Sequence, residues 1–293
     1  MKKIGIMTDS HSGIPREEAD RLGIRVLPMP FYMEGETYYE GVDISSEEFY
    51  EKLRSGVNVS TSQQSPQQIM DMWDEMLKEY EKVLYIPLSS GLSGACMTAQ
   101  AMAREDEYEG KILVVDSGRV ATPLHRIILD ALELIEEGCT AEEIQKILEE
   151  SKTDMSIYIA LNTLENLKKG GRINPAVAVV GEVLNIKPVM QLTTGKLDIY
   201  QKCRGLKKAK HIMIEALKHD VDTRFKDAYD KGELYLMAAS GCTAEETESW
   251  VKQIEEAFPG MKVMCDQLSF GISCHVGPGG LGIGCEVDKK RYR

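Results

Sequence analysis

The first half of the sequence alternates short apolar runs with helix-like stretches, and this alternation limits the fold more than any other feature. Apolar runs with the length of strands lie at residues 3–7, 25–29, 83–86 and 111–115. Helix patterns and caps fill the intervals, at residues 15–22, 46–55, 66–80, 95–104, 124–137 and 141–150. Parallel strands need a crossover connection, usually a helix, so this order predicts an α/β fold with a parallel sheet.

The pattern changes near Asp154, where hairpin-like pairs of strands replace the regular alternation. Strands are expected at residues 155–160, 189–192, 196–200, 233–238 and 262–266, with helices at 164–169, 204–218 and 244–257. A chain of 293 residues also exceeds the usual size of one domain. We therefore predict an N-terminal α/β domain at 1–155 and a C-terminal α+β domain at 156–293, the latter with a mixed or antiparallel sheet.

Composition argues against several classes of function. A net charge of −12 argues against general nucleic-acid binding, which needs a basic surface. No apolar run approaches the roughly 20 residues that a membrane span needs, and the apolar segment before Asp9 is too short for a signal peptide. The 7 cysteines are odd in number and contain no C-x-x-C pair, which favours reduced thiols over disulfides or a zinc site. The expected location is the cytoplasm, with neither a metal nor a cofactor.

A serine- and glycine-rich loop at residues 89–94 is the most specific local feature. It reads Ser-Ser-Gly-Leu-Ser-Gly, follows the apolar run at 83–86 and precedes the helix expected from Ala95. A helix N-terminus exposes unpaired N–H groups, so hydroxyls gathered there form a site for an anion. The loop lacks the lysine of a nucleotide-binding P-loop, which favours a singly charged ligand. A second interpretation makes Ser93 a nucleophile on a strand-to-helix turn, one residue short of the G-x-S-x-G pattern.

Other polar residues follow the expected strands, where ligand sites form in open α/β sheets. Asp9 and Asp116 are most simply explained as caps of the next helices. Thr61 is harder to explain as a cap, because Ser65 can supply that role itself. His275 is expected between a short strand and a glycine-rich turn, where a structural and a functional role are equally well supported.

Several of these motifs occur together in the order and spacing of a known family. They are Thr8-Asp9-Ser10, Val59-Ser60-Thr61-Ser62-Gln63, Ile86-Pro87-Leu88-Ser89-Ser90-Gly91-Leu92-Ser93-Gly94, Val115-Asp116-Ser117, Gly170-Gly171-Arg172-Ile173 and His275-Val276-Gly277-Pro278-Gly279. On these residues the chain resembles the DegV family over nearly its whole length. Two departures affect neighbouring loops: Gln64 stands where the family often has proline, and Gly118-Arg119-Val120 replaces a serine-rich continuation.

The resemblance implies a bacterial fatty-acid-binding protein of two domains, with a long-chain fatty acid in the cleft between them. The residues that would hold its carboxylate are Thr61, Ser62, Ser93, Gly94 and His275. The implied role is that of a lipid carrier and not of an enzyme, since several members present the bound acid to a fatty acid kinase that makes an acyl phosphate. Arg172 and Arg204 carry over as residues that face this kinase.

The serine loop, which is rich in hydroxyls and has no lysine, fits a ligand with one charge and a long apolar tail. A tail of about sixteen carbons, at ~0.8 kcal/mol per buried methylene, contributes roughly 10 kcal/mol before other costs. The segment 175–186 is apolar over most of its length and is expected to form a wall for the tail, or else a plain core helix. A protonated His275 would add a charge-assisted hydrogen bond to the carboxylate.

The competing prediction is a serine hydrolase with Ser93 as nucleophile, His275 as base and Asp266 as the orienting acid. Serine early in the chain and histidine near the end match the order found in α/β-hydrolases. Against it, the turn ends in Gly94-Ala95 where the hydrolase pattern requires x-Gly. The hydroxyl of Thr61 also has no task in such a triad.

Overall fold

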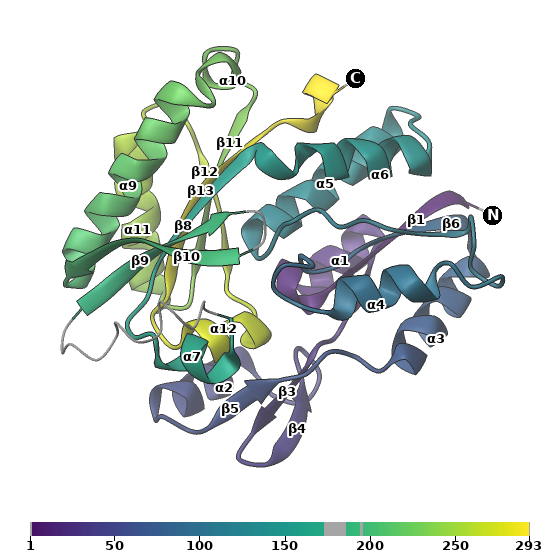
Figure 1. The fold of residues 1–293 in the computed structure, drawn as a ribbon, viewed down its shortest axis with the longest axis horizontal. Helices are drawn as coiled ribbons and strands as arrows, with labels where there is room; N and C mark the ends of the chain where they lie inside the picture. The colour runs from purple at the N-terminus through teal and green to yellow at the C-terminus, as the bar shows by residue number, and fades with distance from the viewer. Residues whose placement is uncertain (1, 173–185, 194–195, 293) are drawn as a thin grey trace.

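The computed structural model describes residues 2–172, 186–193 and 196–292, and three β-sheets organise this part of the chain (Figure 1). A parallel sheet of 4 strands lies in the N-terminal half, and a mixed sheet of 6 strands lies in the C-terminal half. A small antiparallel sheet of 3 strands accompanies them. The predicted fold class, with a parallel sheet followed by a mixed sheet, is confirmed.

The N-terminal sheet is covered by helices on both faces. Its strands, in the spatial order β2-β1-β6-β7, are β1 (Lys2–Asp9), β2 (Arg25–Leu27), β6 (Tyr80–Ile86) and β7 (Ile112–Val114). The accompanying helices are α1 (Arg16–Leu22), α3 (Pro66–Leu77), α4 (Ala95–Met102), α5 (Thr122–Glu136) and α6 (Ala141–Glu150). Ile6 and Leu84 share an apolar cluster with α5 and α6, whereas Met7 and Tyr85 share one with α3 and α4. Side chains alternate along each strand, so these residues bury both faces of the sheet.

Local sequence explains where the helices begin. Ser65 accepts a hydrogen bond from the Gln68 N–H while the Gln68 side chain accepts one from the Ser65 backbone, with Pro66 in the first turn of α3. This capping box satisfies donors that a helix start leaves unpaired. Helix α2 (Ser46–Arg54) is capped by Ser45, whose hydroxyl accepts a hydrogen bond from Glu48 N–H; Ser45 is one of the two caps considered from the sequence.

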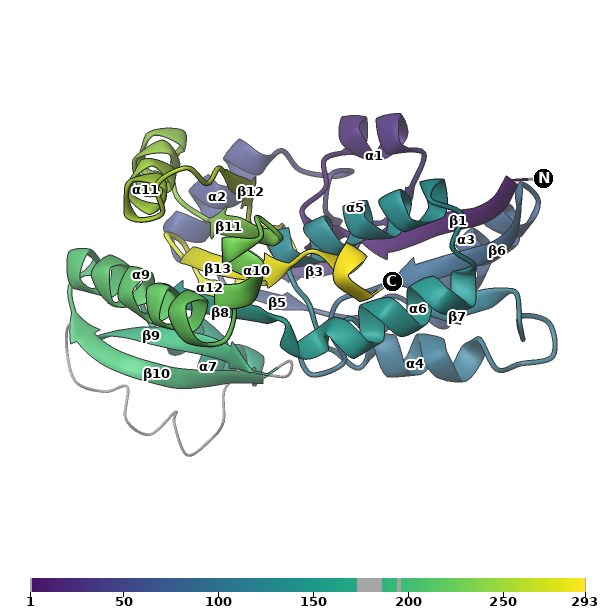
Figure 2. The ribbon, with the colours of Figure 1, turned by 90° about the horizontal axis from the view of Figure 1, so that it is seen from above.

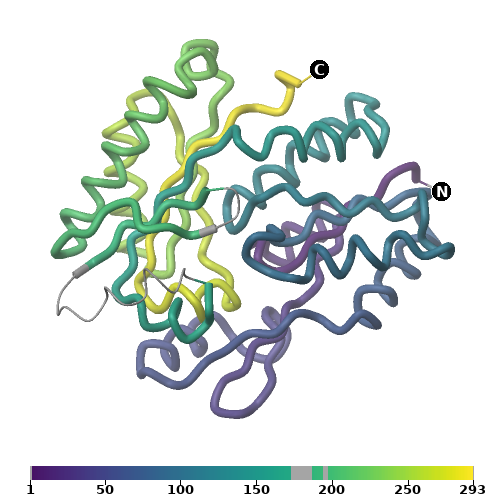
Figure 3. The backbone as a smooth tube through the Cα atoms, viewed as in Figure 1, coloured from purple at the N-terminus to yellow at the C-terminus, as the bar shows by residue number. Residues whose placement is uncertain are grey.

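The small sheet connects the two halves of the molecule. In the order β4-β3-β5, its strands are β3 (Pro30–Met33), β4 (Glu36–Tyr39) and β5 (Val59–Thr61). Phe31 and Phe49 pack against Phe270 of α12 (Phe270–Val276), and the Phe49 and Phe270 rings stack with centroids 4.2 Å apart. Figure 3 shows this segment along the lower edge of the molecule, beside the C-terminal half. The aromatic cluster therefore holds β5, which ends at Thr61, against α12.

The C-terminal sheet has the order β10-β9-β8-β13-β11-β12, and only β11 and β12 are parallel neighbours among its described strands. Its strands are β8 (Met155–Ala160), β9 (Ile186–Thr193), β10 (Lys196–Arg204), β11 (Leu234–Ser240), β12 (Val263–Gln267) and β13 (Leu281–Val287). The other helices are α7 (Glu165–Gly170), α9 (Leu206–Thr223), α10 (Lys226–Asp230) and α11 (Ala244–Ala257). Tyr158 belongs to the cluster under α9 and α11, whereas Ile157 belongs to a cluster shared with Leu88 and Val120 of the N-terminal half. Figure 2 shows the C-terminal half, with α9 and α11, on the left and the N-terminal half on the right. The second face of this sheet therefore faces the N-terminal half.

Two elements near the C-terminus differ from the prediction. The residues before His275 form helix α12 and not a strand, because Ser269 caps them by accepting a hydrogen bond from Ile272 N–H. Strand β13 was not expected, since its glycines weaken a strand pattern. Gly284 is required there: a Cβ atom would lie 2.6 Å from the Ser156 carbonyl oxygen.

Candidate ligand-binding site

An apolar chamber of about 290 Å³ lies where the two halves and the small sheet meet. Leu88 and Val120 from the N-terminal half face Ile159, Leu192 and Val276 from the C-terminal half across it. The polar side chains and backbone predicted to hold a carboxylate also line this cavity: Thr61, Ser62, Ser93, Gly94 and His275. The fold thus brings these residues together from distant parts of the chain.

A smaller inner pocket of about 50 Å³ adjoins the apolar chamber. The two cavities share Val120, Ile159, Ile272 and Val276 as lining residues. The rest of its lining comes mainly from β8, β11 and β13, for example Met237, and from the start of α5, for example Pro123. Apolar surface therefore extends from the chamber toward the C-terminal sheet.

Thr61 and His275 form a hydrogen-bonded pair at the polar side of the chamber. Thr61 Oγ1 at the end of β5 lies 2.8 Å from His275 Nε2 on α12. His275 Nδ1 is buried and has no hydrogen-bond partner among the described residues. An unpaired ring nitrogen costs less as a lone pair than as an N–H group, so we assign the proton to Nε2, which donates to Thr61. The Thr61 hydroxyl hydrogen is then free to donate to a ligand.

His275 is neutral at pH 7. Burial lowers its pKa to about 4, and the positive charge of Arg172 contributes in the same direction. A charge-assisted hydrogen bond from His275 needs the protonated ring, and this condition is not met at neutral pH in the protein alone. His275 contributes a neutral N–H group, which donates to Thr61, and part of the wall of the chamber.

The serine loop is held by two carboxylates. Asp9 Oδ2 accepts a hydrogen bond from Leu88 N–H at 2.8 Å, and Asp116 accepts from both the N–H and the hydroxyl of Ser90. The sequence had suggested that Asp116 caps the next helix. Its carboxylate supports the serine loop instead. Ser93 Oγ accepts from the Ala95 N–H at 3.2 Å, which leaves the Ser93 hydroxyl hydrogen available.

His11 is a chamber residue that the sequence reasoning missed. Its Nδ1 lies 2.9 Å from Asp9 Oδ1, which also accepts from the His11 backbone N–H, so Asp9 caps this turn as expected. Burial alone would lower the pKa of His11, but the Asp9 carboxylate outweighs burial and the pKa is raised. The spacing of Asp9 and His11 directly after a strand was the available signal.

The residues of the hydrolase hypothesis are not assembled as a triad. Asp266 Oδ2 lies 3.1 Å from His125 Nδ1, so the Asp266 carboxylate pairs with His125 and not with His275. His275 is paired with Thr61, and Ser93 with Ala95. In a catalytic triad the base contacts both the nucleophile and the orienting acid. The hydrogen bonds of Ser93, His275 and Asp266 described above are instead with other residues.

Arg172 lies beside the serine loop, whereas Arg204 lies elsewhere. Arg172 lines the apolar chamber, and its Nε donates to the Leu92 carbonyl oxygen at 3.3 Å. Arg204 is the exposed last residue of β10 and lines neither the chamber nor the inner pocket. The predicted tail wall at 175–186 lies outside the described residues except for the backbone of Ile186.

The two departures from the family pattern are both buried. The Gln64 amide donates to the Pro28 carbonyl oxygen, which fixes the loop after β5. Arg119 is fully buried and donates to Glu286 Oε1 of β13 at 2.9 Å and to the Ser151 carbonyl oxygen at 2.8 Å. Removing one partner of such a buried pair is costly, so Arg119 ties the loop after β7 to the C-terminal sheet.

Two other kinds of feature are absent from the described residues. No helix in this part of the chain is long and apolar enough to cross a membrane. No group of three or more His, Cys, Asp and Glu side chains within it is placed to hold a metal ion.

Fold and cavity together define a class: an α/β protein whose two larger sheets enclose an apolar chamber with hydroxyls and a histidine at its polar side. The model of a family described as uncharacterised DegV proteins matches residues 3–288, and the chain belongs to the DegV family. A DegV domain-containing protein of Caldanaerobacter subterraneus is 31% identical over 287 residues, covering 97% of this chain and 98% of the relative.

Solved structures of the family have the same fold. A fatty-acid-binding DegV family protein from Thermus thermophilus has a TM-score of 0.83 and 30% identity, with 97% of this chain and 99% of that chain covered. DegV from Bacillus subtilis, described as a fatty acid binding protein, has a TM-score of 0.84 and 28% identity, with coverage of 98% and 100%. Both neighbours are thus similar to this chain over nearly their whole length.

Proposed function

We infer that this protein binds a long-chain fatty acid, with the carboxylate at the polar side of the apolar chamber and the tail along its apolar walls. The observation that carries this proposal is one cavity in which Thr61, Ser93 and His275 face a predominantly apolar lining. The fatty-acid-binding relatives from Thermus thermophilus and Bacillus subtilis support it. We also propose that the chain forms two domains, 1–155 and 156–293, and that the ligand lies between them.

The head group is held by donors that the protein leaves unused. With Nε2–H of His275 donating to Thr61 and Ala95 N–H donating to Ser93, both hydroxyl hydrogens are free to donate to a carboxylate. Hydrogen bonds to an ionised acceptor contribute about 1.5–3 kcal/mol each. Ser62 and the backbone at Gly94 are further candidates, because they line the same cavity. Arg172 is the one lysine or arginine that lines the chamber within the described residues, which suits a single negative charge.

The tail extends toward the inner pocket. Val120, Ile159, Ile272 and Val276 belong to both cavities, so they lie between the head-group region and the apolar groups of the C-terminal sheet. Each methylene removed from water contributes ~0.8 kcal/mol, so the tail supplies most of the affinity and the hydroxyls fix the orientation.

Extraction and a matched pair of variants test the proposal. Mass spectrometry of an organic extract of the purified protein should find an intact fatty acid. Thr61→Val keeps the branched shape but removes the hydroxyl, and should weaken palmitate binding about tenfold or more, as expected for one hydrogen bond to a charged group. Ser60→Ala is the control, because Ser60 is the neighbouring hydroxyl and does not line the chamber. Equal affinities of the two variants would refute the head-group assignment.

The protein acts as a cytoplasmic carrier that presents the bound acid to a fatty acid kinase, with Arg172 and Arg204 facing the partner. Both are basic residues on a chain with a net charge of −12, which supports a role in recognising an acidic surface. A kinase-coupled assay of Arg172→Ala and Arg204→Ala, with palmitate binding measured in parallel, tests this role. Phosphorylation should fall in both variants, and palmitate binding should persist in Arg204→Ala, whose side chain does not line the chamber; loss of palmitate binding in Arg204→Ala would overturn the assignment.

A further inference from the structure

His11 brings a second polar group into the apolar chamber, apart from the Thr61–His275 pair. Its side chain lines the chamber and is only 8% exposed. Within the described residues, the contact of 2.9 Å between Nδ1 and Asp9 Oδ1 is the one hydrogen bond of the His11 ring. Asp9 also accepts from the His11 backbone N–H, so two contacts fix the orientation of the side chain. Nε2 is therefore held in place without a partner of its own in this part of the chain.

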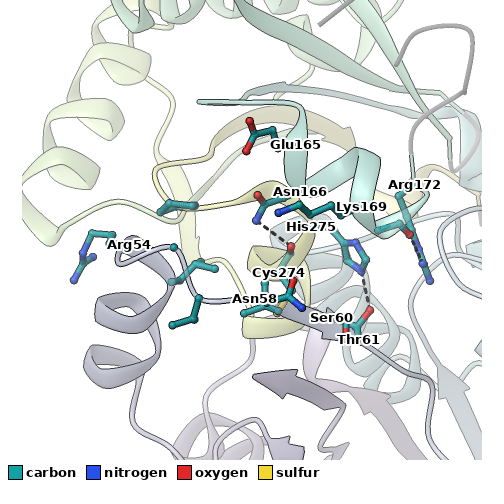
Figure 4. Close-up of a pocket in the computed structure, with 16 residues that line it drawn as sticks. Arg54, Asn58, Ser60, Thr61, Glu165, Asn166, Lys169, Arg172, Cys274 and His275 are labelled. Carbon is teal, nitrogen blue, oxygen red and sulfur yellow. Dashed lines mark hydrogen bonds between the residues drawn. The ribbon is translucent and has the colours of Figure 1, made fainter. Parts of the chain in front are cut away.

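The neighbours of His11 place it on the side of the chamber toward the inner pocket. A Cβ atom on Gly271 would lie 2.7 Å from His11 Nε2, so this nitrogen lies against the backbone of α12. His275, which Figure 4 shows reaching from α12 to Thr61, follows Gly271 by four residues on the same side of the helix, roughly 6 Å along its axis. The His11 carbonyl oxygen accepts from the N–H of Ala121, which lines the inner pocket. A tail that leaves Thr61 toward the inner pocket thus passes Nε2.

An unsubstituted tail leaves His11 Nε2 unsatisfied. Methylene groups laid over this nitrogen exclude water and offer no hydrogen bond. Covering an unpaired polar group in this way costs about 1–3 kcal/mol. An oxygen atom on the tail at this point removes that penalty and adds a hydrogen bond.

The charges around His11 favour a hydroxyl group over a second carboxylate. Burial alone would lower the pKa of His11, but the negative charges of Asp9 and Glu40 raise it, whereas Arg172 acts in the opposite direction. Glu40 is buried beside α12, where its Oε1 accepts from Phe270 N–H at 2.7 Å. Two acidic groups already near the ring repel a further anion. A hydroxyl is neutral, and it can accept from Nε2–H of the charged ring or donate to Nε2 of the neutral ring.

Resting on the proposed fatty-acid site, we propose that His11 forms a second polar subsite that binds a hydroxyl group on the acyl chain, so that the protein prefers hydroxylated long-chain fatty acids to unsubstituted ones. The spacing along α12 indicates where the hydroxyl lies. A distance of roughly 6 Å corresponds to about four or five C–C bonds of about 1.5 Å each. The preferred ligand therefore carries its hydroxyl on C5 or C6, counted from the carboxylate carbon.

Binding of 5- and 6-hydroxypalmitate, compared with palmitate, tests the subsite. Wild type should bind the better of the two hydroxy acids about fivefold or more tightly than palmitate. His11→Leu should bind that hydroxy acid about tenfold or more weakly than wild type does, while its palmitate affinity stays within about twofold or rises. Gly271→Ala retains the Asp9–His11 pair but places a methyl group against Nε2, and it should abolish the preference as well.

His125→Leu is the matched control. His125 is also a buried histidine paired with an aspartate, Asp266, but it does not line the chamber. This variant should keep the wild-type preference for the hydroxy acid. Loss of the preference in His125→Leu to the same extent as in His11→Leu would refute the subsite, because the effect would then follow from removing any buried histidine.

The other outcomes separate this inference from the fatty-acid site. Wild type that binds palmitate at least as tightly as both hydroxy acids would refute the hydroxyl subsite and leave the fatty-acid site intact. An equal loss of palmitate and hydroxypalmitate affinity in His11→Leu would also refute it, since His11 would then act on the carboxylate. Failure of wild type to bind any of the three acids would remove the fatty-acid site and this inference with it.

Discussion

Replacing Gly170 with alanine should displace His275 and break its hydrogen bond to Thr61. A Cβ atom on Gly170 would lie 2.1 Å from Nδ1 and 2.6 Å from Cε1 of the imidazole. Non-bonded atoms need about 3.5 Å or more, so the ring has to move by roughly 1 Å or more. The Thr61–His275 contact of 2.8 Å does not survive such a shift at hydrogen-bonding geometry.

Two opposing effects set the size of the change in the free energy of unfolding. Alanine in place of glycine within a helix stabilises by up to about 1 kcal/mol, and Gly170 is the last residue of α7. Overpacking against His275 costs about 1–3 kcal/mol. The net change in wild type is therefore a loss of about 0–3 kcal/mol. In a His275→Ala background the clash disappears, so the same substitution should be neutral or stabilising.

Urea unfolding of wild type, Gly170→Ala, His275→Ala and the double variant measures the coupling between the two positions. The expected coupling is about 1–3 kcal/mol, and palmitate affinity should fall in Gly170→Ala by about as much as in Thr61→Val. If the two changes are additive within about 0.5 kcal/mol, the packing of α7 against the imidazole is not as described.

Two further predictions concern acidic and basic groups around the site. Asp116→Ala should destabilise the protein by about 2–3 kcal/mol at neutral pH and weaken palmitate binding, because Ser90 loses its acceptor; wild-type stability and affinity would contradict this. Burial alone would raise the pKa of Asp116, but hydrogen bonds from Ser90 and Lys152 lower it. In urea titrations below about pH 4, the difference in the free energy of unfolding between wild type and Asp116→Ala should therefore narrow. Burial lowers the pKa of His275 to about 4, so the unfolded state takes up the proton first and wild type loses stability as the pH falls from about 6.5 toward 4. His275→Gln should flatten that part of the stability profile, and an unchanged slope would show that His275 is not buried as a neutral group.

The parts of the fold that depend only on residues close together in the chain were predictable from the sequence. The strand before Ser89, the loop and the helix from Ala95 follow one another between Tyr80 and Met102, and each has its own local pattern. The cap at Ser65 likewise depends only on Pro66 and Gln68 nearby. These features need no knowledge of distant neighbours, so local propensity is sufficient.

Features that depend on distant partners were missed or misinterpreted. Asp116 resembled a helix cap, but its acceptor oxygens serve Ser90, which precedes it by 26 residues. The strands of the small sheet have only 3 or 4 residues, too few for a clear alternation. Helix α12 is rich in residues that favour strands, but the cap at Ser269 and the tertiary contacts of Phe270 favour the helix. The neutral form of His275 follows from burial, which the sequence does not reveal.

The length of chain between Thr61 and His275 has a consequence for how the protein is made. Their hydrogen bond joins positions 214 residues apart, and α12, which carries His275, is preceded by every strand except β13 in the described chain. Contacts of such long sequence separation form late, after loop closure of the intervening chain. During synthesis from the N-terminus, the serine loop and Thr61 therefore exist for most of translation without the wall that completes the chamber. A ribosome-bound chain halted before α12 therefore lacks the closed chamber.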